Sequence, residues 1–293
     1  MVSATMHHGI IVGIDGSSAA ADAVQWAAHE AAMHNVPLTL IHVLPSPVVM
    51  TWPDLPLPAA FMEWPREEGR IIVRNAVALA EAAAERPIHI KSDMVAGPAV
   101  AALADLSKEA QMVVVGCRGR GRLHQLLGSV SAGLIHHGHC PVVVVHDDDP
   151  LIPDPDFASV VVGIDGSPAS ESATAIAFDE ASRRGVQVVA IHACSDWGGG
   201  DHPGIDWPLV EQRGYEVLAE RLAGWQERYP DVSVHRVVVA DNAAEHLVAR
   251  SKRAQLIVVG SHGRGGFAGM LLGSVSSAVA QTVRIPVIVA RTS

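Results

Sequence analysis

Short, unbroken apolar runs alternate along the chain with longer segments whose apolar residues recur at helical spacing. The run at 9–15 ends in Asp15-Gly16-Ser17 and is followed by an Ala-rich segment, which predicts a helix that ends near Asn35. In the first half of the chain this pattern predicts strands over residues 9–15, 36–44, 88–95, 111–116 and 141–146, and helices over residues 19–34, 67–86, 98–109 and 129–138. Strands and helices therefore alternate, as they do in α/β proteins.

Two of the apolar runs, Val113–Val115 and Val142–Val145, contain no polar residue. Continuous runs of this kind are typical of strands buried on both faces, and so of a parallel sheet with helices on each side. Five strands joined by right-handed crossovers predict a doubly wound, flavodoxin-like sheet. Ligands bind such sheets beyond the carboxyl ends of the strands, which directs attention to Asp15, to the end of the second strand and to the loop after the fourth.

The second half of the chain repeats the first. The segment Ile11-Val12-Gly13-Ile14-Asp15-Gly16-Ser17 recurs as Val161-Val162-Gly163-Ile164-Asp165-Gly166-Ser167, and Gly128-Ser129-Val130-Ser131 recurs as Gly273-Ser274-Val275-Ser276. Because the repeated segments keep their order, we interpret the chain as a tandem duplication of one domain. We expect a first domain over residues 1–146, an acidic, Pro-rich linker over 147–157 and a second domain over 158–293.

Composition and charge exclude several classes of protein. The chain of 293 residues is 49% hydrophobic and carries 31 acidic against 21 basic residues, a net charge of −10. This argues against a disordered chain, and the acidity and the 4% of aromatic residues argue against a nucleic-acid partner. No apolar run is long enough to span a membrane and no signal peptide is evident. The three dispersed cysteines are typical of reduced thiols, so we expect a cytoplasmic protein.

The glycine-rich loop after the fourth strand is the strongest candidate site. In the second copy it runs from Gly260 to Ser276 and contains Gly263, Arg264, Gly265 and Gly273. Glycines let backbone N–H groups approach an anion, and a helix N-terminus at Ser274 favours phosphate. Ser274 and Ser276 can add hydroxyl donors and Arg264 a cation. The alternative interpretation is a simple turn in which Ser274 is an ordinary N-cap.

The strand-tip aspartates are the second candidate. Asp15 and Asp165 each follow a glycine, Gly13 and Gly163, and stand where a dinucleotide-binding protein has its pyrophosphate turn. A carboxylate there suits a ribose hydroxyl, a base amine or Mg²⁺ better than bare phosphate. The alternative is a turn or N-cap aspartate. The chain contains no GxxxxGK[ST] and no GxSxG, which excludes a P-loop protein and argues against a serine hydrolase.

The spacing Gly260-x2-Gly263-x9-Gly273-Ser274 resembles the ATP-binding signature of the universal stress proteins, and the likeness extends over both halves in the tandem form of mycobacterial members. The resemblance implies an adenine nucleotide alpha hydrolase-like fold and one ATP site per domain, with Mg²⁺ entering with the nucleotide and no separate metal site. It places adenine and ribose near Asp15 and Val43, and near Asp165 and Ala193. It places the phosphates on Gly260, Gly263, Gly273, Ser274 and Val275, and in the first copy on Gly116, Gly119, Gly128, Ser129 and Val130, with Arg120 and Ser131 nearby.

The first copy departs from this signature. Only eight residues, Arg120 to Leu127, separate Gly119 from Gly128, which is one fewer than the signature requires. Losing one residue re-aims several N–H groups, although Arg118, Arg120 and Arg122 can compensate as cations. We therefore predict that the second site binds ATP at least as tightly as the first.

Other residues favour structural roles. We expect the segment His136-His137-x-His139-Cys140 to hold exposed or capping histidines rather than a zinc site, and His42 and His192 to be packed and hydrogen-bonded. Trp52, Trp64, Trp197 and Trp207 can cover the site or pack at an interface, and we expect packing. The apolar last strands, Val142–Val145 and Val287–Ala290, together with the resemblance, imply pairing of the two halves and a homodimer.

The leading functional hypothesis is a stress-response regulator that senses or sequesters adenine nucleotide, with an unknown downstream protein partner. The alternative is an enzyme of related fold, a slow ATPase or a nucleotidyl or phosphoryl transferase. No positioned general base is evident, which argues against efficient catalysis. A third hypothesis is an interaction scaffold that binds no nucleotide. The sequence does not distinguish ATP, ADP and AMP as the ligand.

Overall fold

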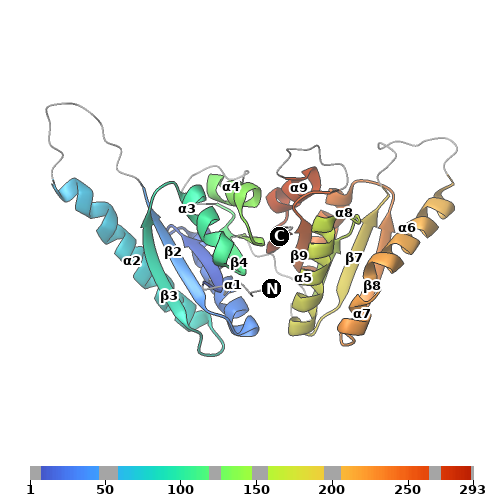
Figure 1. Ribbon diagram of the computed structural model, residues 1–293, viewed down its shortest axis with the longest axis horizontal. Coiled ribbons are helices and arrows are strands. Elements are labelled where there is room, and N and C mark those ends of the chain that lie inside the picture. The colour runs from blue at the N-terminus through green and yellow to red at the C-terminus, as the bar shows by residue number, and fades with distance from the viewer. Residues whose placement is uncertain are drawn as a thin grey trace, which may run out of the picture. The chain divides into compact units, whose positions relative to one another are not determined.

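The computed structural model describes residues 8–45, 59–118, 127–146, 158–194, 206–263 and 272–291, without the side chains of 59–64. It divides into two compact units, Met1–Asp147 and Asp148–Ser293 (Figure 1). Both halves contain the alternating strands and helices that the sequence predicts for one half. The α/β class and the two tandem doubly wound domains are therefore confirmed.

The first domain is a five-stranded, fully parallel sheet in the order β3-β2-β1-β4-β5. Its strands are β1 (Ile10–Ile14), β2 (Leu38–Leu44), β3 (Ile90–Ala96), β4 (Met112–Gly116) and β5 (Val142–Val145). Its helices are α1 (Ser18–His34), α2 (Ala59–Ala83), α3 (Ala99–Leu106) and α4 (Ser129–His137), with a 3-10 turn η1 (Ser107–Glu109). Helix α1 packs against α2 and α3 packs against α4 (Figure 1).

The second domain repeats this sheet in the order β8-β7-β6-β9-β10, again fully parallel. Its strands are β6 (Ser159–Gly163), β7 (Val188–Ala193), β8 (Val234–Val239), β9 (Ala254–Gly260) and β10 (Val287–Ala290). Its helices are α5 (Pro168–Arg184), α6 (Trp207–Leu222), α7 (Trp225–Arg228), α8 (Ala243–Ser251) and α9 (Ser274–Thr282).

This strand order decides where a ligand can bind. β1 lies between β2 and β4, and β6 lies between β7 and β9, so the chain direction across the sheet reverses at β1 and β6. The gap between the tips of β1 and β4, and between those of β6 and β9, is therefore the topological switch point of each sheet. Asp15 and Asp165 follow the central strands at this gap, and the glycine-rich loops follow the neighbouring ones.

The core forms as the apolar runs predict. Val113–Val115 and Val142–Val145 are buried, as are the Ala-rich faces of α1 and α5. Small alanines let these helices lie close to the sheet, which matters below for the glycines at the strand ends. Cys117, Cys140 and Cys194 are free thiols. None of the described helices is both long and apolar enough to cross a membrane.

One boundary differs clearly from its prediction. Helix α2 begins at Ala59 rather than at residue 67, and it includes Pro65. Pro65 is the seventh residue of the helix, so it lacks an N–H that would otherwise donate within the helix, and the helix continues through it. Pro65 therefore did not mark the start of the helix.

Candidate functional site

The turn between β1 and α1 is held by its own side chains. Asp15 Oδ1 accepts hydrogen bonds from the Ser17 amide at 2.9 Å and from the Ser17 hydroxyl at 2.6 Å. Ser17 Oγ in turn accepts from the Ala20 amide at 3.2 Å and is the N-cap of α1. Gly16 supplies the positive φ of +79° that the turn requires. The aspartate thus braces the turn, and Ser17 rather than Asp15 caps the helix.

The corresponding turn in the second domain keeps this geometry and adds a link to the glycine-rich loop. Asp165 Oδ1 accepts from the Ser167 amide at 2.9 Å, and Ser167 Oγ accepts from the Ser170 amide at 3.2 Å. The Ser167 hydroxyl, however, donates to the carbonyl of His262 at 3.2 Å rather than to its aspartate. This bond ties the start of α5 to the segment that follows β9.

Gly263 and Asp165 lie directly against each other. A Cβ atom added to Gly263 would overlap Oδ2 of Asp165, so only glycine fits there while the carboxylate keeps its position. Gly263, the second glycine of the predicted signature, and Asp165, the strand-tip carboxylate, are 98 positions apart in the sequence. They are nevertheless adjacent at the switch point. The structure therefore brings together two residues that the sequence singled out independently.

The first glycine of each signature has a packing role of its own. A Cβ atom on Gly116 would lie 2.5 Å from the backbone carbon of Ala19, and one on Gly260 would lie 2.8 Å from that of Ala169. These glycines allow α1 and α5 to approach the ends of β4 and β9. Gly13 and Gly163 face the neighbouring helices in the same way, with a Cβ atom 3.0 Å from Leu103 and 3.4 Å from Leu247.

Helices α4 and α9 begin at the ends of the glycine-rich loops. Their N-caps are Gly128 and Gly273, neither of which offers a side chain to the first turn. Ser274 is therefore not the N-cap that the simple-turn alternative requires, and the first N–H groups of both helices have no side-chain cap among the described residues. Ser129 and Ser274 are exposed in that first turn, followed by the half-buried Val130 and Val275.

Two predicted hydroxyl donors are used inside the protein. Ser131 and Ser276 are buried, and they donate to the carbonyl oxygens of Gly116 and Gly260. The amides of Gly128 and Gly273 donate at 2.7 Å to the carbonyls of Cys117 and Ser261. These bonds fix the two ends of each loop, so Ser131 and Ser276 position the loop instead of presenting their hydroxyls at its surface.

The ends of β2 and β7 lie beside the tips of the central strands. Ile14 pairs with His42 and Gly163 pairs with Ile191, so Val43 and Ala193 follow the last paired positions of β1 and β6. The histidine before each one hydrogen-bonds through Nδ1 to the residue that precedes the aspartate, His42 to Ile14 at 2.8 Å and His192 to Ile164 at 2.7 Å. These histidines are packed and hydrogen-bonded as expected. Their repeated Ile-His pattern was the only signal that they position the aspartates.

Several predicted residues lie outside the described part of the chain. They are Gly119, Arg120, Arg122, Arg264 and Gly265 of the loops, together with Trp52 and Trp197 and the side chain of Trp64. Trp207 begins α6, and His136 and His137 end α4 with their ring centroids 6.3 Å apart.

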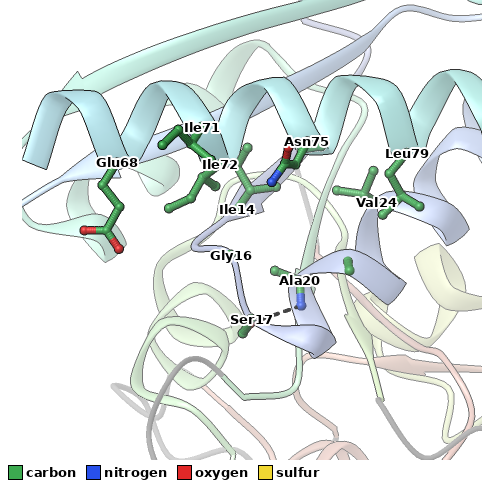
Figure 2. A pocket seen from close by; sticks show the side chains of 12 residues that line it. Ile14, Gly16, Ser17, Ala20, Val24, Glu68, Ile71, Ile72, Asn75 and Leu79 are labelled. Carbon is green, nitrogen blue, oxygen red and sulfur yellow. Dashed lines mark hydrogen bonds between the residues drawn. The ribbon is translucent and has the colours of Figure 1, made fainter.

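A hollow of about 350 Å³, which no sequence pattern predicts, lies next to the turn of the first domain. It lies between α1 and α2, and Figure 2 shows Ile72 of α2 beside Ile14 of β1 and Leu79 of α2 beside Val24 of α1. Gly16 and Ser17 form part of its wall. At the same place in the second domain the guanidinium of Arg221 lies over Gly166, with Nε 3.4 Å from where a Cβ atom would be.

Comparison with known proteins agrees with this architecture. A model described as the universal stress protein family matches residues 6–146 and 157–291. A universal stress protein of Mycobacterium tuberculosis (strain ATCC 25618 / H37Rv) is 55% identical over 296 residues, which cover 100% of this chain and 99% of that protein. One from Mycolicibacterium smegmatis is 50% identical over 294 residues, covering 99% of each. The crystal structure of a universal stress protein from Archaeoglobus fulgidus DSM 4304 covers 99% of this chain and 98% of its own, with a TM-score of 0.70 at 20% identity, a likeness of fold.

Proposed function

Because the chain belongs to the universal stress protein family, we propose that each of its two domains binds one adenine nucleotide, with ATP and Mg²⁺ as the ligand. In each domain the nucleotide lies across the switch point. Adenine and ribose contact the strand-tip aspartate and the backbone of Val43 or Ala193, and the phosphates contact the glycine-rich loop. The protein retains and releases nucleotide as a stress-response regulator rather than turning it over.

The observation that carries this proposal is the contact between Gly263 and Asp165. A carboxylate at this place accepts hydrogen bonds from ribose hydroxyls or from a base amine, and the neighbouring glycine leaves the backbone open to close approach. The uncapped first turn of α9 begins at the far end of the same loop, where N–H groups and the helix dipole favour phosphate oxygens. The switch point of the second domain thus combines a carboxylate for the sugar with the amides of the first turn of α9 for the phosphates.

The first domain supports the same arrangement with one difference. Asp15, Gly116 and the first turn of α4 occupy the same places, and the hydrogen bonds that fix them have nearly equal lengths. Ser17 donates its hydroxyl to Asp15, whereas Ser167 donates to the loop, so the second-domain loop is tied to its turn and the first-domain loop lacks that bond. We therefore infer that the second site is the better organised of the two, which agrees with its full-length loop.

Native mass spectrometry of the purified chain tests the proposal. We expect up to two adenine nucleotides per chain, and one fewer in Gly263→Val, whose side chain would overlap the Asp165 carboxylate. Asp231→Ala is the matched control, since Asp231 is an exposed residue bonded to Ser182 near the C-terminal end of α5. A chain that takes up no nucleotide, even with ATP added, contradicts the proposal.

Cellular location and assembly belong to the same proposal. A nucleotide-responsive regulator acts where ATP is abundant, which is the cytoplasm, and the family resemblance implies a homodimer. Sedimentation velocity of the full chain with and without ATP checks the second part, and a single monomeric species in both conditions contradicts it.

A further inference from the structure

A second hollow lies at the opposite end of the second domain, beside the amino-terminal ends of its strands. Its volume is about 570 Å³. The floor contains Ser159, Val161 and Val189 from β6 and β7, and the rim contains His235 of β8 together with Arg250, Lys252 and Arg253 from the end of α8. Because nucleotide is proposed to bind at the carboxyl ends of the same strands, this hollow is separate from that site.

The rim is positively charged and unneutralised. Arg250, Lys252 and Arg253 are basic side chains, and no carboxylate is among the described residues that line the hollow. None of these three cations forms an ion pair within the described ranges. In a chain of net charge −10, with many acidic side chains available, three unpaired cations around one hollow are a specific feature.

The first domain shows that the fold does not require these cations. At the positions of Ala249, Arg250, Lys252 and Arg253 it has Asp105, Leu106, Lys108 and Glu109, and Lys108 is neutralised by Asp105 at 2.7 Å. The helix nevertheless ends in the same way in both domains, because Ser107 donates to the carbonyl of Ala104 and Ser251 donates to that of Val248. The end of the helix therefore does not require Arg250 and Arg253, whose counterparts are Leu106 and Glu109, whereas Lys252 has a basic counterpart in Lys108.

From the basic residues at its rim and from its size, we propose that this hollow binds a small polyanion that carries phosphate groups. Guanidinium groups suit phosphate because they offer paired N–H donors, and Lys252 adds a point charge. Ser159 and Gln187 supply neutral hydrogen-bonding groups at the edge of the floor. The ligand is a free, multiply charged phosphate compound of nucleotide size or smaller, and it binds independently of the two nucleotide sites.

Titration of the full, ¹⁵N-labelled chain with inorganic pyrophosphate, followed by NMR, tests the proposal. We expect saturable shifts of the amide signals of His235, Lys252 and Arg253. The variant Arg250→Leu/Arg253→Glu carries the residues that the first domain has at these positions, so it is compatible with the fold. We expect it to bind pyrophosphate at least tenfold more weakly. The control Arg236→Ala removes a cation of the same strand that is bonded to Gln226, and it should leave the affinity unchanged.

The other outcomes overturn the proposal. Shifts confined to the amides around Gly263 and Gly273 would assign pyrophosphate to the nucleotide site. Equal affinity in the double variant would remove the cations from any role in binding, and the single variant Lys252→Ala repeats this comparison if the double variant unfolds. Tighter binding of an oligo-aspartate peptide than of pyrophosphate would assign the hollow to an acidic protein segment instead.

Discussion

In the first domain α1 packs closely along α2, whereas in the second domain α5 and α6 have little direct contact. The residue at the matching position of the two first helices explains part of this difference: it is Ala28 in α1 and Phe178 in α5, and both are buried. Phe178 stacks on Trp225 and lies against Tyr229, with ring centroids 5.7 and 5.9 Å away. An aromatic cluster therefore fills the layer that α1 and α2 fill by direct helix packing.

The surface between these helices changes character as well. The hollow of the first domain is mainly apolar, and five of its apolar lining positions carry polar or charged residues in the second domain. The pairs are Ala20 and Ser170, Ala21 and Glu171, Val24 and Thr174, Ile71 and Glu216, and Ala76 and Arg221. Arg221 also brings a cation over Gly166, beside the start of α5.

The strand tips, by contrast, hardly differ. Both turns keep an aspartate that accepts from the serine amide at 2.9 Å, and both keep a histidine that bonds the preceding residue. The helix layer over one face of the sheet has thus diverged without disturbing the turn next to it. The geometry of the strand tip is therefore set by hydrogen bonds within the turn and to the neighbouring strand, and only weakly by the side chains packed behind it.

The largest expected effect is that of Phe178→Ala. Truncating a fully buried aromatic residue removes its packing and leaves a cavity, so we expect the second domain to lose about 3–5 kcal/mol of unfolding free energy. Because two domains need not unfold together, denaturation should show one transition that moves and one that does not. Phe178→Leu is the control and should cost less. A loss below about 1 kcal/mol would show that the cluster does not support this layer.

The next largest effect is the loss of unfolding free energy when either strand-end glycine is replaced by alanine. Gly116→Ala places a Cβ atom 2.5 Å from the backbone of Ala19, and Gly260→Ala places one 2.8 Å from that of Ala169. Overpacking of this kind costs about 1–3 kcal/mol, and the closer contact predicts the larger loss in the first domain. Urea denaturation of both variants measures the difference. Equal losses, or a larger loss in Gly260→Ala, would contradict the comparison.

A smaller effect separates the two N-cap serines. Each accepts one amide hydrogen bond at 3.2 Å, so removal of either hydroxyl should cost about 1 kcal/mol. Each variant also loses the bond that its hydroxyl donates, to Asp15 in Ser17→Ala and to His262 in Ser167→Ala, which adds roughly 0.5–1.5 kcal/mol in both. Only the bond to His262 reaches the glycine-rich loop, so only Ser167→Ala loosens that loop. Ser17→Ala is therefore the matched control, and faster amide hydrogen exchange at His262 and Gly263 should occur in Ser167→Ala alone.

The smallest effect is the pH dependence of stability that comes from the Asp105–Lys108 ion pair, which the second domain lacks. The hydrogen bond from Lys108 and then its charge hold the pKa of Asp105 below its usual value. A lowered pKa in the folded state stabilises above the unfolded pKa, and this contribution is lost as the pH falls through the folded value. Lys108→Ala should flatten the acid side of the first-domain stability profile below about pH 4. The second domain has Ala249 at this position and should not respond.

Most of the fold could be predicted from the sequence because the valine runs and the repeated Asp-Gly-Ser turn each act locally. The start of α2 could not, because a proline indicates a helix start or break in the sequence pattern, whereas α2 continues through Pro65. The apolar hollow and the aromatic cluster could not either, because they depend on how far apart two helices lie. Within the candidate site, the aspartates and glycines stood out individually, but the contact of Gly263 with Asp165 and the inward hydroxyls of Ser131 and Ser276 required the three-dimensional structure.

The central claim is one adenine nucleotide site at each strand tip, and calorimetric titration of ATP into Asp15→Ala and Asp165→Ala tests it most directly. We predict two equivalents of ATP for the unaltered chain, and a loss of about 10- to 100-fold in affinity at one site in each variant, as expected for hydrogen bonds to a carboxylate. The site left intact in Asp15→Ala should bind at least as tightly as the one left intact in Asp165→Ala. Two unchanged sites in both variants, or the greater total loss in Asp15→Ala, would contradict the account.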